Sequence, residues 1–204
     1  MIALVDYGVG NLFSLACSFK KIGENSLVTG DPEQIRASDG IVLPGVGAFR
    51  DAAEKLRASG LDTVLMDEVR KGKKLLGICL GMQLLFEKSL ENGEYEGLGL
   101  MEGTVRPLAE RADPQLKIPQ IGWNALHITG QSPLLRNTNE GDFAYFVHSY
   151  YADTPAENVI AVTDYSFPVT AAVARGCVYG CQFHPEKSGD VGLKILKAFC
   201  EVKS

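Results

Sequence analysis

Residues 75–81 read LLGICLG, and this stretch decides what fold the rest of the chain builds. Leu75 to Ile78 is a short, wholly apolar run, which is typical of a strand buried on both faces of a sheet. The glycines that flank Cys79 at two residues' distance permit a sharp turn, where a Cβ atom would collide with neighbouring backbone. We therefore predict a buried strand that turns tightly into a helix, with Cys79 at the turn.

Further strand and helix signals alternate around this turn. Apolar runs that predict strands lie at residues 2–5, 26–29 and 41–43, the last of which is expected to stop at Pro44-Gly45. Helical patterns lie at residues 12–21, 48–58, 61–71 and from the turn through Leu90, and Asn11 is the expected cap of the first helix. This alternation predicts a parallel sheet that is covered by helices on both faces.

The second half of the chain has a different pattern. Short β-like segments lie at residues 103–106, 125–129, 143–147, 159–162 and 169–174. Arg175-Gly176 can turn a hairpin into a last strand at 177–183, and a helix is expected at 188–202. The predicted fold class is α/β: a mostly parallel central sheet flanked by helices, with additional antiparallel strands in the second half. No repeat or linker interrupts it, so we expect one domain over residues 1–204.

Composition excludes several classes of function. The chain has 204 residues, 46% of them hydrophobic, and a net charge of −5, which is unlike a disordered chain. It lacks the clustered basic residues that nucleic-acid binding requires and an apolar run long enough to span a membrane. The opening MIALVDYG has no basic leader, and five cysteines form an odd number, so we expect free thiols in a reducing cytoplasm. Cys17 and Cys200 are expected to be inert packing on apolar helix faces.

Cys79 is the candidate nucleophile. A cysteine in a strand-to-helix turn lies at a helix N-terminus, where the helix dipole favours the thiolate. The backbone amide of the next residue, Leu80, is then placed to bind developing negative charge as an oxyanion donor. The alternative is a buried cysteine with a purely structural role, which is a common fate of free cysteines.

A general base for such a nucleophile is available at His184. Pro185 disfavours helical backbone at His184 and predicts an extended segment, in which residues two apart share a side. Glu186 can then orient the imidazole of His184, although His-x-Glu also arises by chance on strands. Of the other histidines, His127 is expected in an edge strand with a structural role, and His148 at a strand end or in a loop.

Two other sequence patterns could indicate a bound metal or a bound cofactor. Cys177, Cys181 and His184 are close in sequence, but in one strand the cysteines face away from His184 and a fourth ligand is missing, so we predict no metal and no cofactor. The Gly8-x-Gly10 segment lacks the third glycine of a dinucleotide fingerprint and is interpreted as a turn.

Two further segments can complete a catalytic site. The glycine-rich loop at 44–47 follows a strand of the same sheet and can offer a second oxyanion donor, or it can be a plain turn. Gln83 lies four residues after Cys79, on the same helix face, where it can hold a polar substrate.

Several motifs together carry a resemblance to a known family. GICLGMQLLF at 77–86, PGVGAF at 44–49 and HPEKS at 184–188 resemble the class I (triad) glutamine amidotransferases. Within this family, DYGVGNLFS at 6–14, IPQIGWN at 118–124 and FVHSYY at 146–151 are similar to the glutaminase subunits of imidazole glycerol phosphate synthase. The resemblance extends over nearly the whole chain, and the catalytic positions match throughout.

The resemblance implies a role for each matching residue. Cys79 matches the nucleophile, His184 the general acid and base, and Glu186 the residue that orients it. The oxyanion hole matches the Leu80 amide and the loop Gly45, Val46 and Gly47, which is expected to rearrange for activity. Glutamine-binding positions match Gln83, His148, Ser149 and Tyr150. The implied reaction is hydrolysis of L-glutamine to glutamate and ammonia through a cysteinyl thioester, without a cofactor.

The resemblance also implies a partner. This is the (βα)₈-barrel cyclase subunit, which receives ammonia through a channel and makes imidazole glycerol phosphate and an aminoimidazole carboxamide ribotide in histidine biosynthesis. Trp123, Tyr145 and Lys187 match positions near the docking face. Two alternatives stay open: a related triad enzyme, either an amidotransferase serving another synthase or a peptidase, and a non-enzymatic module in which Cys79 senses oxidants.

Overall fold

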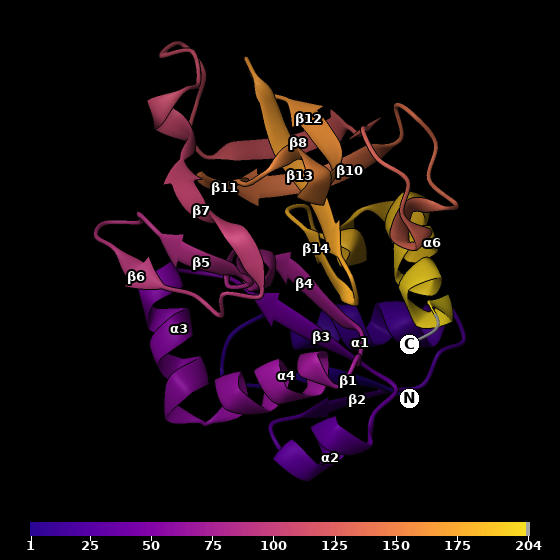
Figure 1. Ribbon diagram of the computed structural model, residues 1–204. Coiled ribbons are helices and arrows are strands. Elements are labelled where there is room, and N and C mark those ends of the chain that lie inside the picture. Colours follow the sequence, from indigo (N-terminus) through magenta and orange to yellow (C-terminus); the bar gives the residue numbers. More distant parts are fainter. Residues whose placement is uncertain (203–204) are drawn as a thin grey trace.

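The computed structural model describes residues 1–202 and is built around an eight-stranded mixed sheet (Figure 1). The strand order is β2-β1-β3-β4-β14-β13-β12-β9. The first five strands are parallel: β2 (Ser26–Thr29), β1 (Ile2–Val5), β3 (Gly40–Gly45), β4 (Leu75–Cys79) and β14 (Val178–Cys181). The last three are antiparallel: β13 (Pro168–Arg175), β12 (Val159–Asp164) and β9 (His127–Ile128). This confirms the predicted fold class.

Helices cover both faces of the parallel part of the sheet. They are α1 (Leu12–Lys21), α2 (Pro32–Ala37), α3 (Phe49–Ala58), α4 (Leu61–Arg70) and α6 (Gly189–Glu201). Alternate strand residues face opposite layers: Leu4 joins the core beneath α1 and α6, whereas Ala3 and Val5 join the core beneath α2, α3 and α4. The side chain of Asn11 accepts a hydrogen bond from the amide of Ser14 and caps α1 as predicted.

Two smaller sheets lie beside the large one. One has the order β11-β7-β5-β6, with β11 (Tyr150–Asp153), β7 (Met101–Pro107), β5 (Phe86–Ser89) and β6 (Tyr95–Glu96). The other pairs β10 (Phe143–His148) with β8 (Gln120–Ala125). Short 3₁₀ turns lie at Leu108–Glu110, Pro133–Leu135, Ala156–Asn158 and Pro185–Lys187. The chain passes from β10 to β11 at Ser149. On either side of it, the carbonyl of Val147 contacts Cys79 at the end of β4, and the carbonyl of Tyr150 contacts Gln83.

The helix predicted from the turn through Leu90 is wrong. The helix α5 covers only Leu80–Gln83, and the chain then forms β5, which pairs with β7. Leu84, Leu85 and Phe86 are all buried, with at most 1% of each exposed. The helix ends here because the carbonyls of these three residues accept hydrogen bonds from amides within residues 98–101 instead of from amides four residues ahead in the chain.

Three smaller expectations also need correction. Strand β3 continues through Pro44 and Gly45, which pair with β4; β1 does not extend this far, so the missing N–H of Pro44 leaves no partner unsatisfied. Helix α2 was not predicted, although Asp31 caps it. Cys17 is exposed rather than packed, because it lies about 200° around α1 from its buried neighbour Leu15.

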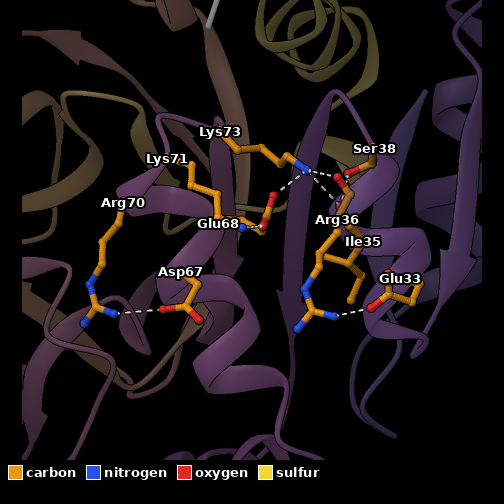
Figure 2. Close-up of polar contacts among 9 residues, drawn as sticks. All are labelled: Glu33, Ile35, Arg36, Ser38, Asp67, Glu68, Arg70, Lys71 and Lys73. Carbon is orange, nitrogen blue, oxygen red and sulfur yellow. Dashed lines mark hydrogen bonds and ion pairs between the residues drawn. The ribbon is translucent and has the colours of Figure 1, made fainter.

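Figure 2 shows how α2 is fastened to the end of α4. The ammonium group of Lys73 donates to the carbonyls of Ile35 (3.1 Å) and Arg36 (2.6 Å) in the last turn of α2, and the Ile35 carbonyl also accepts from the amide of Ser38 at 3.2 Å. The same group pairs with Glu68 at 2.7 Å, and Lys71 pairs with the other carboxylate oxygen at 2.7 Å. Glu68 is 4% exposed, so its charge is buried but balanced.

Candidate active site

Cys79 ends β4 in a strained conformation. Its φ is +54° and its ψ −114°, which residues other than glycine adopt rarely and mostly at functional sites. A Cβ on Gly77 would lie 2.6 Å from the carbonyl oxygen of Gly81, and one on Gly45 would lie 2.7 Å from the amide of Gly81. The glycines therefore allow β3, β4 and α5 to cross closely, as the sequence predicted for the turn.

His184 and Glu186 form a hydrogen-bonded pair. His184 Nδ1 donates to Glu186 Oε1 at 2.8 Å, and each side chain is 3% exposed. Burial alone would lower the pKa of His184, but the hydrogen bonds and charges of Cys79 and Glu186 outweigh it and raise the pKa to about 9. The predicted meeting of the two is confirmed, but Glu186 reaches His184 from a 3₁₀ turn rather than from an extended segment.

Ser188 holds this pair against β10. Its hydroxyl donates to the carbonyl of His184 at 2.6 Å and accepts from the amide of Tyr145 at 3.0 Å. The amide of His184 also donates to the carbonyl of Tyr145 at 2.9 Å. No local sequence pattern predicts this role of Ser188, because the role depends on contacts with the distant strand β10.

A cavity of about 390 Å³ opens over Cys79 and His184. It is lined by Val46, Gly47, Cys79, Leu80, Gln83, Glu91, Pro119, Val147, His148, Ser149, Tyr150, His184 and Lys187. Most of the residues that the sequence analysis proposed therefore meet in one cavity. Gly45 is buried and does not line the cavity, whereas Glu91 lines it although no sequence motif indicated this.

The glycine-rich loop is held firmly at both ends and loosely between them. The hydroxyl of Tyr7, whose pKa is raised by burial, donates to the carbonyl of Pro44 at 2.8 Å. At the other end, the amide of Phe49 donates to a carboxylate oxygen of Glu91 at 2.8 Å. Between them Val46 is 45% exposed, and Gly47 has a φ of +95° with open space around it. Rearrangement is therefore cheapest at the peptides next to Gly47.

His148 enters the cavity wall as a neutral ring. Burial, aided by the charge of His184, lowers the pKa of His148 to about 4, although the hydrogen bond to the Tyr150 carbonyl opposes this. Nδ1 donates to that carbonyl at 2.7 Å, so Nε2 carries the lone pair. The same carbonyl accepts from the side-chain amide of Gln83 at 3.2 Å. Tyr150 thus fixes the orientation of two lining residues through its backbone.

The three residues expected near a partner lie together on the outer face of β8 and β10. The rings of Trp123 and Tyr145 pack edge to face with centroids 5.9 Å apart, and the ammonium group of Lys187 lies 5.8 Å from the Tyr145 centroid. Trp123 is 54% exposed, and its neighbours Ile121 and Phe143 are 61% and 55% exposed. This surface joins the cavity through Lys187.

Other candidates from the sequence lie apart from this chemistry. His127 lies on the edge strand β9, as expected, and its Nδ1 lies 2.7 Å from Glu140 Oε1. Among residues 1–202, no group of three or more His, Cys, Asp or Glu side chains is arranged to hold a metal ion. No helix in the same range is long and apolar enough to cross a membrane.

Comparison with known proteins gives consistent matches. The model of the family described as glutamine amidotransferase class-I matches residues 3–202. The imidazole glycerol phosphate synthase subunit HisH of Oceanobacillus iheyensis is 46% identical over 203 residues, which cover 99% of each chain. The subunit of the same name from Bacillus thuringiensis is 50% identical over 199 residues, or 98% of this chain and 93% of that one.

A solved structure supports the likeness of fold. The structure of PurLQS from Thermotoga maritima contains a chain that superposes with a TM-score of 0.75, over 98% of this chain and 96% of that one. The identity is only 18%, so this match bears on the fold alone.

Proposed function

Because the chain belongs to the class-I glutamine amidotransferase family, we propose that it is the glutaminase subunit of an imidazole glycerol phosphate synthase. The observation that carries the proposal is the full-length identity of about one half to subunits of that synthase. Cys79 and His184 line one cavity and Glu186 is hydrogen-bonded to His184, which supports the chemistry.

Catalysis begins with the sulfur of Cys79. The thiolate attacks the side-chain amide carbon of glutamine, and the oxygen of that amide gains negative charge. The amide of Leu80 and a peptide of the loop around Gly47 are the donors that stabilise this charge. His184, held as an imidazolium by Glu186, gives its proton to the leaving nitrogen, so that ammonia departs and a γ-glutamyl thioester remains.

The second half of the reaction uses the same residues in reverse. His184, now neutral, takes a proton from a water molecule, which attacks the thioester carbon. The carbon–sulfur bond breaks, glutamate is released, and the thiolate of Cys79 and the imidazolium of His184 are restored. Glu186 does not exchange a proton; it holds the ring and favours its charged form.

The partner is a (βα)₈-barrel cyclase that consumes the ammonia. The exposed aromatic surface of Trp123 and Tyr145, with Lys187 at the cavity mouth, is the docking face that we propose. Large exposed aromatic side chains beside a positive charge are typical of interface anchors. Docking there covers the cavity, so ammonia leaves toward the cyclase instead of toward solvent.

The test is an assay of glutamate release by the chain alone and with the cyclase. We expect turnover when the cyclase and its phosphoribulosyl substrate are present, together with formation of imidazole glycerol phosphate. Activity with the partner of another amidotransferase-dependent synthase, and none with the cyclase, would contradict the proposal. A glutamine analogue that alkylates Cys79 would separately contradict a purely redox-sensing role.

A further inference from the structure

We propose that Gln182 is a further catalytic residue, whose side-chain amide donates a hydrogen bond to the sulfur of Cys79 and stabilises the thiolate. Gln83 is the positioning residue that keeps the amide in this orientation. The inference rests on the proposed function in one respect, namely that Cys79 acts as the nucleophile.

The contacts form a chain of three side chains. Gln182 Nε2 lies 3.8 Å from Cys79 Sγ. The Oε1 atom of the same amide accepts from Gln83 Nε2 at 3.0 Å. Gln83 Nε2 also donates to the backbone carbonyl of Tyr150 at 3.2 Å. Gln182 is 0% exposed and Gln83 4%, so protein atoms rather than solvent decide how each amide is turned.

The orientation of both amides follows from one backbone atom. The carbonyl of Tyr150 can only accept, so the Gln83 atom that faces it must be the nitrogen. The second hydrogen of that nitrogen points to Gln182, so the Gln182 atom facing it must be the oxygen. The remaining atom of the Gln182 amide is its nitrogen, and this atom faces the sulfur. Turning either amide over would place like groups against each other in a buried site.

Besides the imidazole of His184, which also hydrogen-bonds to it, the sulfur therefore has one acceptor and one amide donor beside it. The carbonyl of Val147 lies 3.9 Å from Sγ and can accept the proton of the neutral thiol. When the proton is gone, that carbonyl offers nothing to the sulfur, whereas the Gln182 amide still donates. A hydrogen bond to the charged form of a group favours that form. The arrangement thus supports the thiolate both before attack and again when sulfur leaves the acyl group.

The test measures the reactivity of Cys79 directly, without glutamine and without the cyclase. Every protein carries Cys17→Ser, because Cys17 is exposed and would consume reagent. Alkylation of Cys79 by iodoacetamide is followed by peptide mass spectrometry from pH 5.5 to 10. In Gln182→Met, which keeps the volume but removes the donor, we expect alkylation at pH 7 to be about tenfold slower and the curve to move to higher pH.

Two variants separate this role from simple packing. Gln83→Met keeps the volume but removes the donor that orients the Gln182 amide, without adding a charge near the sulfur; we expect slower alkylation at pH 7 although Gln182 is unchanged. Gln120→Met is the matched control, because Gln120 is also 0% exposed but its side-chain amide has no hydrogen bond to the sulfur or to any other group in residues 1–202. Its alkylation curve should match that of the parent.

The outcome is decisive in either direction. If folded Gln182→Met and Gln83→Met both keep the parent curve within twofold, the amide does not act on the sulfur and the inference is overturned. If Gln182→Met does not fold, the alkylation curve of Gln83→Met decides. A chain that fails to use glutamine with the cyclase contradicts the proposed function instead, since alkylation needs neither component.

Discussion

At the residue scale, Cys79 and His184, the proposed nucleophile and base, line one cavity because they follow neighbouring strands. Cys79 ends β4, and His184 follows three residues after the end of β14, which pairs in parallel with β4. Side chains at the carboxyl ends of adjacent parallel strands converge at one edge of a sheet, where open α/β sheets bind their ligands. The sequence therefore predicted this meeting from two short motifs.

Other residues of the site could not be predicted in this way. The roles of Ser188, Tyr7 and Glu91 are hydrogen bonds to backbone atoms of distant segments, and these distances exist only in the folded chain. Gln182 carried a weak signal, as a polar residue that follows a buried strand. Its contact with Cys79, however, spans 103 positions of sequence.

The base and its orienting carboxylate should differ in their contribution to catalysis. We expect His184→Ala to slow formation of the thioester more than Glu186→Gln does, because only His184 transfers a proton. General acid–base catalysis contributes about 10²–10⁴-fold. Single-turnover acylation, with folding checked by circular dichroism, measures both variants. A larger defect in well-folded Glu186→Gln would show that the two roles have been assigned the wrong way round.

The buried side chain of Gln120 is expected to lower the stability of the folded chain. Both polar atoms of its side chain are buried and without a hydrogen-bond partner among the described residues. Burying an unpaired amide costs about 1–3 kcal/mol, and an apolar side chain of similar volume avoids this penalty. We expect Gln120→Met to be as stable as the parent or more stable by about 1 kcal/mol. Urea unfolding measures this, and a clear loss of stability would mean that the amide is in fact paired.

At the element scale, strands and amphipathic helices were predictable and the segment after Cys79 was not. Local periodicity identified α1, α3, α4 and α6, because each buries one stripe on the sheet. It failed for β5, because the apolar run before this strand is buried on all sides by contacts with distant elements. The glycines of the loop at 44–47 predicted backbone flexibility. The structure shows that hydrogen bonds from Tyr7 and to Glu91 fix the two ends of this segment, so the flexibility is confined to its middle.

The bond between α2 and α4 should depend on pH. Burial raises the pKa of Glu68, but the hydrogen bonds and charges of Lys71 and Lys73 outweigh it, so its pKa is lower in the folded protein than the ordinary 4.5. The ion pairs therefore contribute fully above about pH 4.5, and this contribution is lost as pH falls through the folded-state pKa. We expect Glu68→Gln to lose about 1–3 kcal/mol at pH 7 and less at lower pH.

The matched control for Glu68 lies one residue away. Asp67 pairs with Arg70 at 2.9 Å, but both side chains are exposed, and Figure 2 shows this pair beside the buried one. Exposed ion pairs contribute about 0–1 kcal/mol, so Asp67→Asn should unfold in urea almost as the parent does. Equal losses in the two variants, or a loss in Glu68→Gln that stays constant down to pH 3, would contradict the assignment.

At the scale of the whole molecule, we expect docking and catalysis to be linked through the loop around Gly47. An oxyanion donor that is turned away removes about 10²–10³-fold of rate. The cyclase can favour the productive orientation only by binding it more tightly than the other. We expect the chain alone to hydrolyse glutamine slowly and the substrate-loaded cyclase to stimulate it strongly, mainly in kcat. Steady-state kinetics measure this, and equal rates with and without the loaded cyclase would exclude gating.

We propose that Cys79 is the nucleophile that releases ammonia from glutamine and that the partner consumes this ammonia. The most direct measurement compares glutamine and added ammonia as nitrogen sources for the complex of Cys79→Ser with the cyclase. We expect no imidazole glycerol phosphate from glutamine and a normal yield from ammonia, because the acceptor chemistry belongs to the partner. Normal product formation from glutamine by the Cys79→Ser complex would contradict this proposal.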